Sequence, residues 1–199
     1  MIASAEVGAQ TSGVSLRGFA DVGSTTFTAK ESFTAVLGSE RGVVFGGGVE
    51  AVLPQRVFVA LRASRFREQG ERVFLFDGES FDLGIPTTVT VTPVELSGGY
   101  RFGVGARLVP YAGGGIGWHR YQETSEFAEA SENVEETFRG YHVFGGAEVR
   151  LARWMGVGAE AQWATVPDAL GQDPNGVSAA FDESDLGGVT LRVKLVIGR

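Results

Sequence analysis

The residues of this chain that could do chemistry form one set, in which charged side chains and two histidines recur at every second position within apolar segments. The set comprises Arg17, Asp21, Glu50, Arg62, Glu95, Arg101, His119, His142, Glu148, Arg150, Glu160, Arg192 and Lys194. A spacing of two places such residues on one face of extended strands. Because an unpaired charge shielded from water is costly, six cations and five carboxylates on a shared face predict a network of guanidinium–carboxylate hydrogen bonds. The alternative is a hydrated interior, for which the many glycines on the same face leave space.

His119 and His142 are the candidates for acid–base or metal chemistry. Both fall on the polar face, and a hairpin register that keeps this facing can place them directly opposite one another. With Tyr121 and Glu123 they would make a weak metal site. A hydrolase would also need a serine and an acid beside a histidine, and no Ser-x-His or His-x-Ser context occurs. We therefore expect two neutral histidines within a polar interior, no catalytic residues, and no cofactor or metal.

Oxygen ligands for calcium are offered by Asp173-Pro-Asn-Gly176 and by Asp182-Glu-Ser-Asp185. Neither stretch has the spacing of a complete calcium loop, so a turn is the favoured interpretation of the first.

The composition excludes several classes of protein. The chain has 199 residues, 43% of them hydrophobic, which fits a single domain over 1–199 with 1–12 as an N-terminal extension. There is no Cys, and the net charge of −7 argues against a nucleic-acid partner. No apolar run is long enough for a membrane-spanning helix, and 1–10 lacks the features of a secretory signal, so an exported form is expected to have lost its signal before this numbering begins.

Period-two patterning rich in Val, Phe, Tyr and Gly predicts eight strands, most of them long enough to cross a bilayer when tilted. They are expected at 13–23, 42–53, 56–66, 88–102, 107–121, 138–151, 154–165 and 187–198. Tight turns alternate with long connections at 24–41, 67–87, 122–137 and 166–186. Short and long connections would then lie at opposite ends of the sheet, which is typical of outer-membrane barrels, with short periplasmic turns and long extracellular loops.

The face opposite the charges is apolar throughout. It runs from Val14, Leu16 and Val22 on the first strand to Val193, Leu195 and Ile197 on the last. A soluble barrel of lipocalin type would turn this face inward, whereas a membrane barrel would turn it toward lipid. Aromatic side chains fall at two heights, and they are Tyr100, Phe102 and Trp154 at the short-turn end and Trp118, Tyr141 and Trp163 at the long-loop end. Such belts mark the two membrane–water interfaces and favour lipid.

Charge is distributed unevenly between the two ends. The four long connections sum to −14, which leaves +7 for the remainder, with Arg56, Arg107, Arg153 and Arg199 at or beside the short-turn end. An acidic outer rim suits lipopolysaccharide bridged by divalent cations, and a basic inner rim suits anionic headgroups. Solvation of the loops would explain the acidic runs equally well.

Three segments carry a resemblance to a known superfamily: Val94-Glu-Leu-Ser-Gly-Gly-Tyr-Arg-Phe102, Val109-Pro-Tyr-Ala-Gly-Gly-Gly-Ile-Gly117 and Gly145-Gly-Ala-Glu-Val-Arg150. In them the chain resembles the small outer-membrane protein β-barrels of Gram-negative envelopes, the OmpX-, OmpW- and OmpA-barrel-like group. The resemblance implies an all-β, eight-stranded antiparallel up-and-down transmembrane barrel. Such barrels commonly end in an aromatic residue, whereas this chain ends in Gly198-Arg199, which implies a variant insertion signal or a missing residue or two.

The superfamily includes adhesins, small-molecule pores and lipid-modifying enzymes, so the resemblance is specific for architecture and weak for function. We expect a non-enzymatic protein of the bacterial outer membrane with a structural or surface-interaction role through its acidic extracellular loops. Its expected partners are outer-membrane lipid, lipopolysaccharide and a protein or surface reached by the long loops. A narrow, porin-like pore or carrier for a small solute is the first alternative, and a lipid-modifying barrel enzyme is the second.

Overall fold

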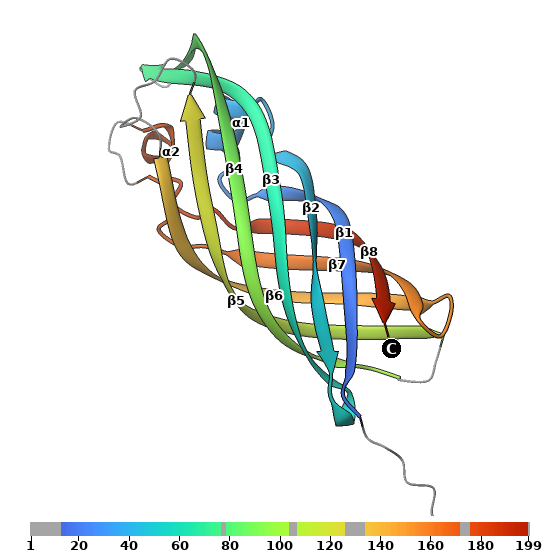
Figure 1. Ribbon diagram of the computed structural model, residues 1–199. Helices are drawn as coiled ribbons and strands as arrows, with labels where there is room; N and C mark the ends of the chain where they lie inside the picture. Colours follow the sequence, from blue (N-terminus) through green and yellow to red (C-terminus); the bar gives the residue numbers. More distant parts are fainter. Residues whose placement is uncertain (1–12, 77–78, 104–106, 126–133, 172–175, 199) are drawn as a thin grey trace, which may run out of the picture.

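The strands of the protein close into one barrel in which every neighbouring pair is antiparallel and follows sequence order (Figure 1). The structure is a computed structural model and describes residues 13–76, 79–103, 107–125, 134–171 and 176–198. The barrel closes through pairing of the first strand with the last, for example Asp21 with Lys194. This confirms the predicted fold class. The N-terminal extension 1–12 lies outside the described residues.

Eight strands and three short helical segments make up the described chain. The strands are β1 (Ser15–Phe27), β2 (Arg41–Val52), β3 (Val57–Phe76), β4 (Glu79–Arg101), β5 (Leu108–Ser125), β6 (Val134–Arg150), β7 (Met155–Thr165) and β8 (Gly188–Gly198). The helical segments are α1 (Lys30–Leu37), a 3₁₀ turn at Pro54–Arg56 and α2 (Val177–Ala180). In the described residues, neither α1 nor α2 has the length and apolar content to span a bilayer.

The connection predicted as a loop at 67–87 is a paired ribbon instead. β3 and β4 remain hydrogen-bonded past the other strands as far as Phe76 and Glu79, with a register irregularity between Glu71 and Val73. The stretch 67–72 consists of charged residues, Gln and Gly, so it lacks the alternation of apolar and polar residues that predicts a strand, although Gly70 lies against Val36 of α1 and Val73 is buried. Figure 1 shows β3 and β4 rising furthest at the end that carries α1 and α2.

The apolar face of the strands points outward. Leu16, Phe45, Leu61, Val143 and Leu195 are all more than 40% exposed, and with few exceptions the other large apolar residues on this face are similarly exposed. A soluble protein rarely exposes so large an apolar surface. The chain therefore forms a transmembrane barrel, with lipid as the solvent of this band.

Both aromatic groups lie on the outward face. Trp118, Tyr141 and Trp163 are exposed on β5, β6 and β7, where Tyr141 pairs with Ile116 and Thr165. The exposed Arg139 is the next outward-facing residue after Tyr141 on β6, and it pairs with Trp118 of β5. At the other end Tyr100 and Phe102 stack edge to face at 5.1 Å between ring centroids, and Trp154 is exposed in the β6–β7 turn. The apolar band thus has an aromatic margin at each end.

Candidate functional site

The interior of the barrel is built in layers, and the first layer at the short-turn end is a ring of two arginines and two glutamates. Arg101 donates hydrogen bonds to Glu50 at 3.1 Å and to Glu148 at 2.7 Å. Arg17 donates to Glu148 at 3.0 Å and also to Glu50. The four side chains come from β1, β2, β4 and β6, so the ring spans the barrel and its charges cancel.

The second layer is centred on Glu160 of β7. Its carboxylate accepts hydrogen bonds from Arg62 at 2.7 Å, from Lys194 at 3.0 Å and from the Tyr111 hydroxyl at 3.0 Å. Asp21 lies 3.4 Å from the guanidinium of Arg62 and 3.6 Å from that of Arg192. Gln162 bridges onward, accepting from Arg192 and donating to Glu95 at 2.6 Å. Three cations and three carboxylates balance here as well.

Arg150 is the cation in excess among those predicted for the interior. It ends β6 at the short-turn end of the barrel, is only half-buried, and makes no ion pair within the described chain. The other ten charged residues of the predicted set are divided between the two balanced layers.

Four aromatic rings fill the space between the charged layers, and sequence reasoning missed them. Phe58, Tyr111 and Phe144 contact one another with centroids 6.1 to 6.3 Å apart. Phe19 lies beneath two cations, with the Lys194 ammonium 4.6 Å and the Arg62 guanidinium 5.2 Å from its ring centroid. The sequence could have revealed them, because each of the four residues is an even number of positions from the predicted interior residues of its strand and so lies on the same face.

The interior glycines accommodate these rings. A Cβ placed on Gly48, Gly99, Gly113 or Gly146 would lie 2.5 to 2.8 Å from a ring atom of Phe19, Phe58, Phe144 or Tyr111, respectively. The space that the glycines leave is therefore occupied by aromatic side chains.

The two histidines are not opposite one another, so that prediction was wrong. His119 pairs with Phe138 and His142 with Gly115 in the β5–β6 register. His119 is buried beside a cavity of about 50 Å³ that Glu95 and Gln162 also line. In the described residues, no group of three or more His, Asp or Glu side chains is arranged to hold a metal ion.

His142 takes part in a contact that no local motif reveals. Its Nε2 lies 2.8 Å from the Ser97 hydroxyl, and its Nδ1 lies 3.6 Å from a Glu95 carboxylate oxygen. The order Ser–His–Glu is that of a nucleophile, a base and an orienting acid. His142 and Glu95 are almost completely buried, and neither end cavity of the barrel is lined by Ser97 or His142.

An apolar cluster closes the barrel above the second layer. Phe27, Phe33 and Phe66 form its aromatic centre, with Phe27 and Phe33 stacked at 4.0 Å. The cluster is completed by Ala29, Val89, Val91, Val166, Ala169 and Leu186. We call this group the apolar cap. Helix α1 contributes Phe33 and thus forms part of the closure.

A second cavity, of about 410 Å³, lies beyond the apolar cap and is called here the loop-end pocket. Its apolar wall includes Phe33 and Leu37 of α1 and Phe138 of β6. Glu123 and Glu136 also line it, and the Tyr121 hydroxyl donates to Glu123 at 3.0 Å. Burial and the neighbouring Glu123 raise the pKa of Tyr121 well above its ordinary value, so this hydroxyl keeps its proton.

Acidic residues considered for calcium have structural partners instead. Glu183 accepts hydrogen bonds from the backbone N–H groups of Glu31 and Ser32 at the start of α1. Asp185 accepts from the backbone N–H groups of Val166 and Gly187 at 2.8 and 2.6 Å. These two carboxylates therefore cap backbone groups. Of the other candidate stretch, residues 173–175 lie outside the described chain.

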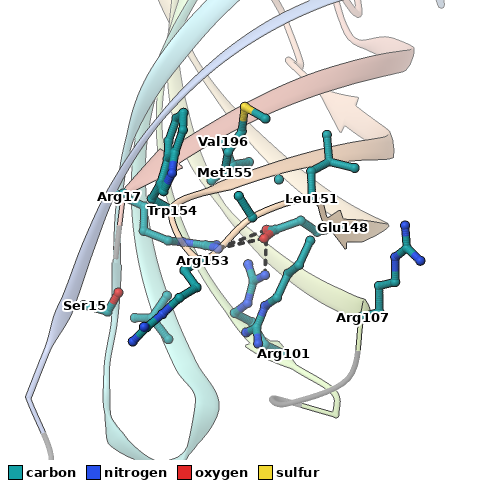
Figure 2. A pocket seen from close by; sticks show the side chains of 15 residues that line it. Ser15, Arg17, Arg101, Arg107, Glu148, Leu151, Arg153, Trp154, Met155 and Val196 are labelled. Carbon is teal, nitrogen blue, oxygen red and sulfur yellow. Dashed lines mark hydrogen bonds and ion pairs between the residues drawn. The ribbon is translucent and has the colours of Figure 1, made fainter.

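A cavity of about 600 Å³ opens at the short-turn end, below the first charged layer. Figure 2 shows Arg17 and Arg101 joined to Glu148, with Arg153 and Arg107 to either side in this view. Arg150 also lines the cavity, and Trp154, Leu151 and Met155 supply apolar surface. We call this cavity the short-turn mouth.

Comparison with solved structures identifies the fold class. The chain is similar to Neisserial surface protein A (13% identity, TM-score 0.59, covering 94% of this chain and 99% of that one). It is similar to a major outer membrane protein from Thermus thermophilus (10% identity, TM-score 0.59, covering 94% of this chain and 99% of that one). It is also similar to the N-terminal β-barrel domain of Pseudomonas aeruginosa OprF (14% identity, TM-score 0.51, covering 92% of this chain and 97% of that one). No protein-family model and no curated protein matches the chain.

The fold is thus that of the small eight-stranded outer-membrane barrels, as the resemblance in the sequence predicted. At these identities the likeness concerns the architecture alone.

Proposed function

We propose that this protein is a non-enzymatic barrel of the bacterial outer membrane that acts as a structural or surface-interaction protein through its long-loop end. The short turns would then face the periplasm and the loop-end pocket the cell exterior. The observation that carries the proposal is the double closure of the interior, first by paired charges and then by the apolar cap. A barrel closed in this way presents its function at an end surface.

The pore alternative is disfavoured by the way the interior is filled. Eight strands leave a lumen about wide enough for side chains. Here the charged side chains are paired directly within each layer, and aromatic rings occupy the glycine-lined gaps between the layers. A conducting path would require the paired charges to be hydrated and the apolar cap to be wetted.

Hydrogen bonds between the connecting segments hold the long-loop end in a defined surface. Glu183 ties the segment before β8 to α1, and Asp185 ties it to the end of β7. A pocket with an apolar wall, two carboxylates and one arginine, Arg72, lies in the resulting surface. This chemistry favours an amphipathic or cationic partner, or lipopolysaccharide bridged through divalent cations, and disfavours nucleic acid.

Conductance tests the closed lumen. The purified protein is reconstituted in planar bilayers at 1 M KCl, with a general porin in a separate bilayer as the positive control. We expect no current steps above the bare membrane. A steady ohmic conductance for the wild-type protein would overturn the closed lumen and favour the pore.

Protease accessibility on intact cells tests which end of the barrel faces the cell exterior. A glutamate-specific protease is expected to cut within 122–137, whereas trypsin is expected to leave the bonds after Arg107 and Arg153 intact until the outer membrane is permeabilised. Tryptic cleavage at Arg107 or Arg153 on intact cells would mean that the barrel is inverted. Full solubility of the folded monomer without detergent would exclude membrane insertion.

A lipid-modifying enzyme is the second candidate, and the Ser97–His142–Glu95 contact is the observation in its favour. Labelling of the folded protein with a fluorophosphonate probe separates the two functions. We expect no labelling at Ser97, because its base and acid are enclosed within the barrel. Labelling that His142→Gln abolishes would favour the enzyme.

A further inference from the structure

The short-turn mouth carries an excess of positive charge that the lumen network does not neutralise. Five arginines line it, together with one glutamate, Glu148. Glu148 is fully engaged, because Arg17 and Arg101 both donate hydrogen bonds to it. The remaining three, Arg107, Arg150 and Arg153, make no ion pair within the described chain.

The three free arginines come from different elements and meet at one cavity. Arg107 directly precedes β5, Arg150 ends β6, and Arg153 lies in the β6–β7 turn. β5 and β6 are paired at this end, where Leu108 is opposite Val149, and the backbone N–H of Arg150 donates to the carbonyl oxygen of Arg107 at 2.8 Å. The local pairing therefore places the backbones of Arg107 and Arg150 next to each other.

The cavity has further features of a binding site. Its volume of about 600 Å³ lies in the range of ordinary ligand pockets. Arg17 also lines the cavity, where its terminal nitrogens are already bonded to Glu50 and Glu148. Trp154, Leu151 and Met155 form an apolar side.

We propose that the short-turn mouth is a binding site for phosphate-bearing anions, held by Arg107, Arg150 and Arg153. Guanidinium groups match phosphate oxygens in geometry and donate two parallel hydrogen bonds, so a cluster of arginines without carboxylate partners selects phosphate over a single carboxylate. The phosphates belong either to a soluble anion or to a lipid headgroup, since the mouth lies at the level of the exposed Tyr100, Phe102 and Trp154. This site is at the opposite end of the barrel from the loop-end pocket and does not depend on its role.

The test uses the full-length folded protein and two probes. Inorganic pyrophosphate is titrated into the protein in an uncharged detergent by isothermal calorimetry, which reports the soluble source. Native mass spectrometry after extraction from nanodiscs of phosphatidylglycerol and phosphatidylcholine reports retained lipid, with binding to phosphatidylglycerol indicating the headgroup source. Binding of either probe supports the site, and the two arms distinguish the sources.

The test variant is Arg107→Gln/Arg150→Gln/Arg153→Gln, which leaves both charged layers of the lumen intact. A matched control, Arg65→Gln/Arg67→Gln/Arg139→Gln, removes the same charge from exposed positions toward the other end. We expect the test variant to weaken binding at least tenfold and the control to change it by less than twofold. Absence of binding by both probes, or equal losses in the two variants, would overturn the proposal, because the second result would reflect net charge alone.

Discussion

The carboxylate of Glu183 holds the first turn of α1, accepting the backbone N–H of Ser32 at 2.8 Å and its hydroxyl at 2.6 Å, although the two residues are 151 positions apart. The residue before α1, Ala29, makes no side-chain cap. Glu183 thus supplies from the last loop the cap that the helix lacks locally, and its negative charge lies at the positive end of the helix. The first long connection, 24–41, and the last, 166–186, are thereby joined at the long-loop end of the barrel.

Glu183→Ala is expected to loosen this end of the barrel. Loss of a helix cap costs about 0.5–2 kcal/mol, so hydrogen exchange of the α1 amides should accelerate while the strand amides stay protected. Asp182→Asn, at the adjacent position, is the matched control and should leave exchange unchanged. Unaltered α1 exchange in Glu183→Ala would show that the cap does not stabilise the helix.

The paired lumen charges should behave as a coupled unit. In Glu160→Gln the cation of Lys194 loses its partner, and in Lys194→Met a carboxylate loses one of its donors. Each single change is expected to cost about 3–5 kcal/mol, and the double variant should lose less than the sum, since no stranded charge remains between the two. Denaturant unfolding in detergent or lipid measures all four proteins.

An exposed pair provides the comparison for that cycle. Arg120 and Glu135 form a hydrogen-bonded ion pair at 2.6 Å with both side chains more than half exposed. The losses in Arg120→Gln and Glu135→Gln should be small and close to additive, because water screens the pair. Additive losses at Glu160 and Lys194 as well would mean that the lumen network is not a coupled plug.

Because aromatic rings pack against the interior glycines, alanine substitutions at the neighbouring Gly99 and Gly98 are expected to differ in their effect on stability. A Cβ at Gly99 would lie 2.5 Å from both the Phe58 ring and the Ala112 carbonyl oxygen, whereas the nearest atom to a Cβ at Gly98 is 3.9 Å away. Gly99→Ala is therefore expected to cost about 1–3 kcal/mol through overpacking, and Gly98→Ala almost nothing. Heat-modifiable mobility on gels and unfolding midpoints would measure the contrast, and equal midpoints would contradict the packed interior.

Glu135 predicts a pH dependence at the β5–β6 hairpin. Hydrogen bonds from Arg120 and Gln122 hold the pKa of the Glu135 carboxyl below its ordinary value of 4.5. A depressed pKa means that the interaction stabilises the hairpin above about pH 4.5 and is lost as the pH falls through the lower value. An NMR titration of the Glu135 side chain should give a midpoint below 4.5, and Arg120→Gln should raise it. A midpoint that does not respond to Arg120→Gln would show that the pair is not formed in solution.

Local periodicity in the sequence by itself determines most of the architecture. Because side chains alternate sides along a strand, a period of two in the residues around Arg62 and Leu61 is enough to sort the lumen from the lipid face. The same reasoning found eight strands and the closed barrel. It failed at the β3–β4 ribbon, because residues 67–72 are charged residues, Gln and Gly and show no alternation of apolar and polar side chains.

Tertiary structure decided which side chains meet. Arg17 and Glu148 are 131 residues apart, and only barrel closure and register bring them to 3.0 Å. The same holds for Ser97 and His142, and for the rings that enter the glycine gaps. Alternation in the sequence assigns a residue to a face but not to a height, whereas pairing depends on both, because charges and rings interact only over a few ångströms.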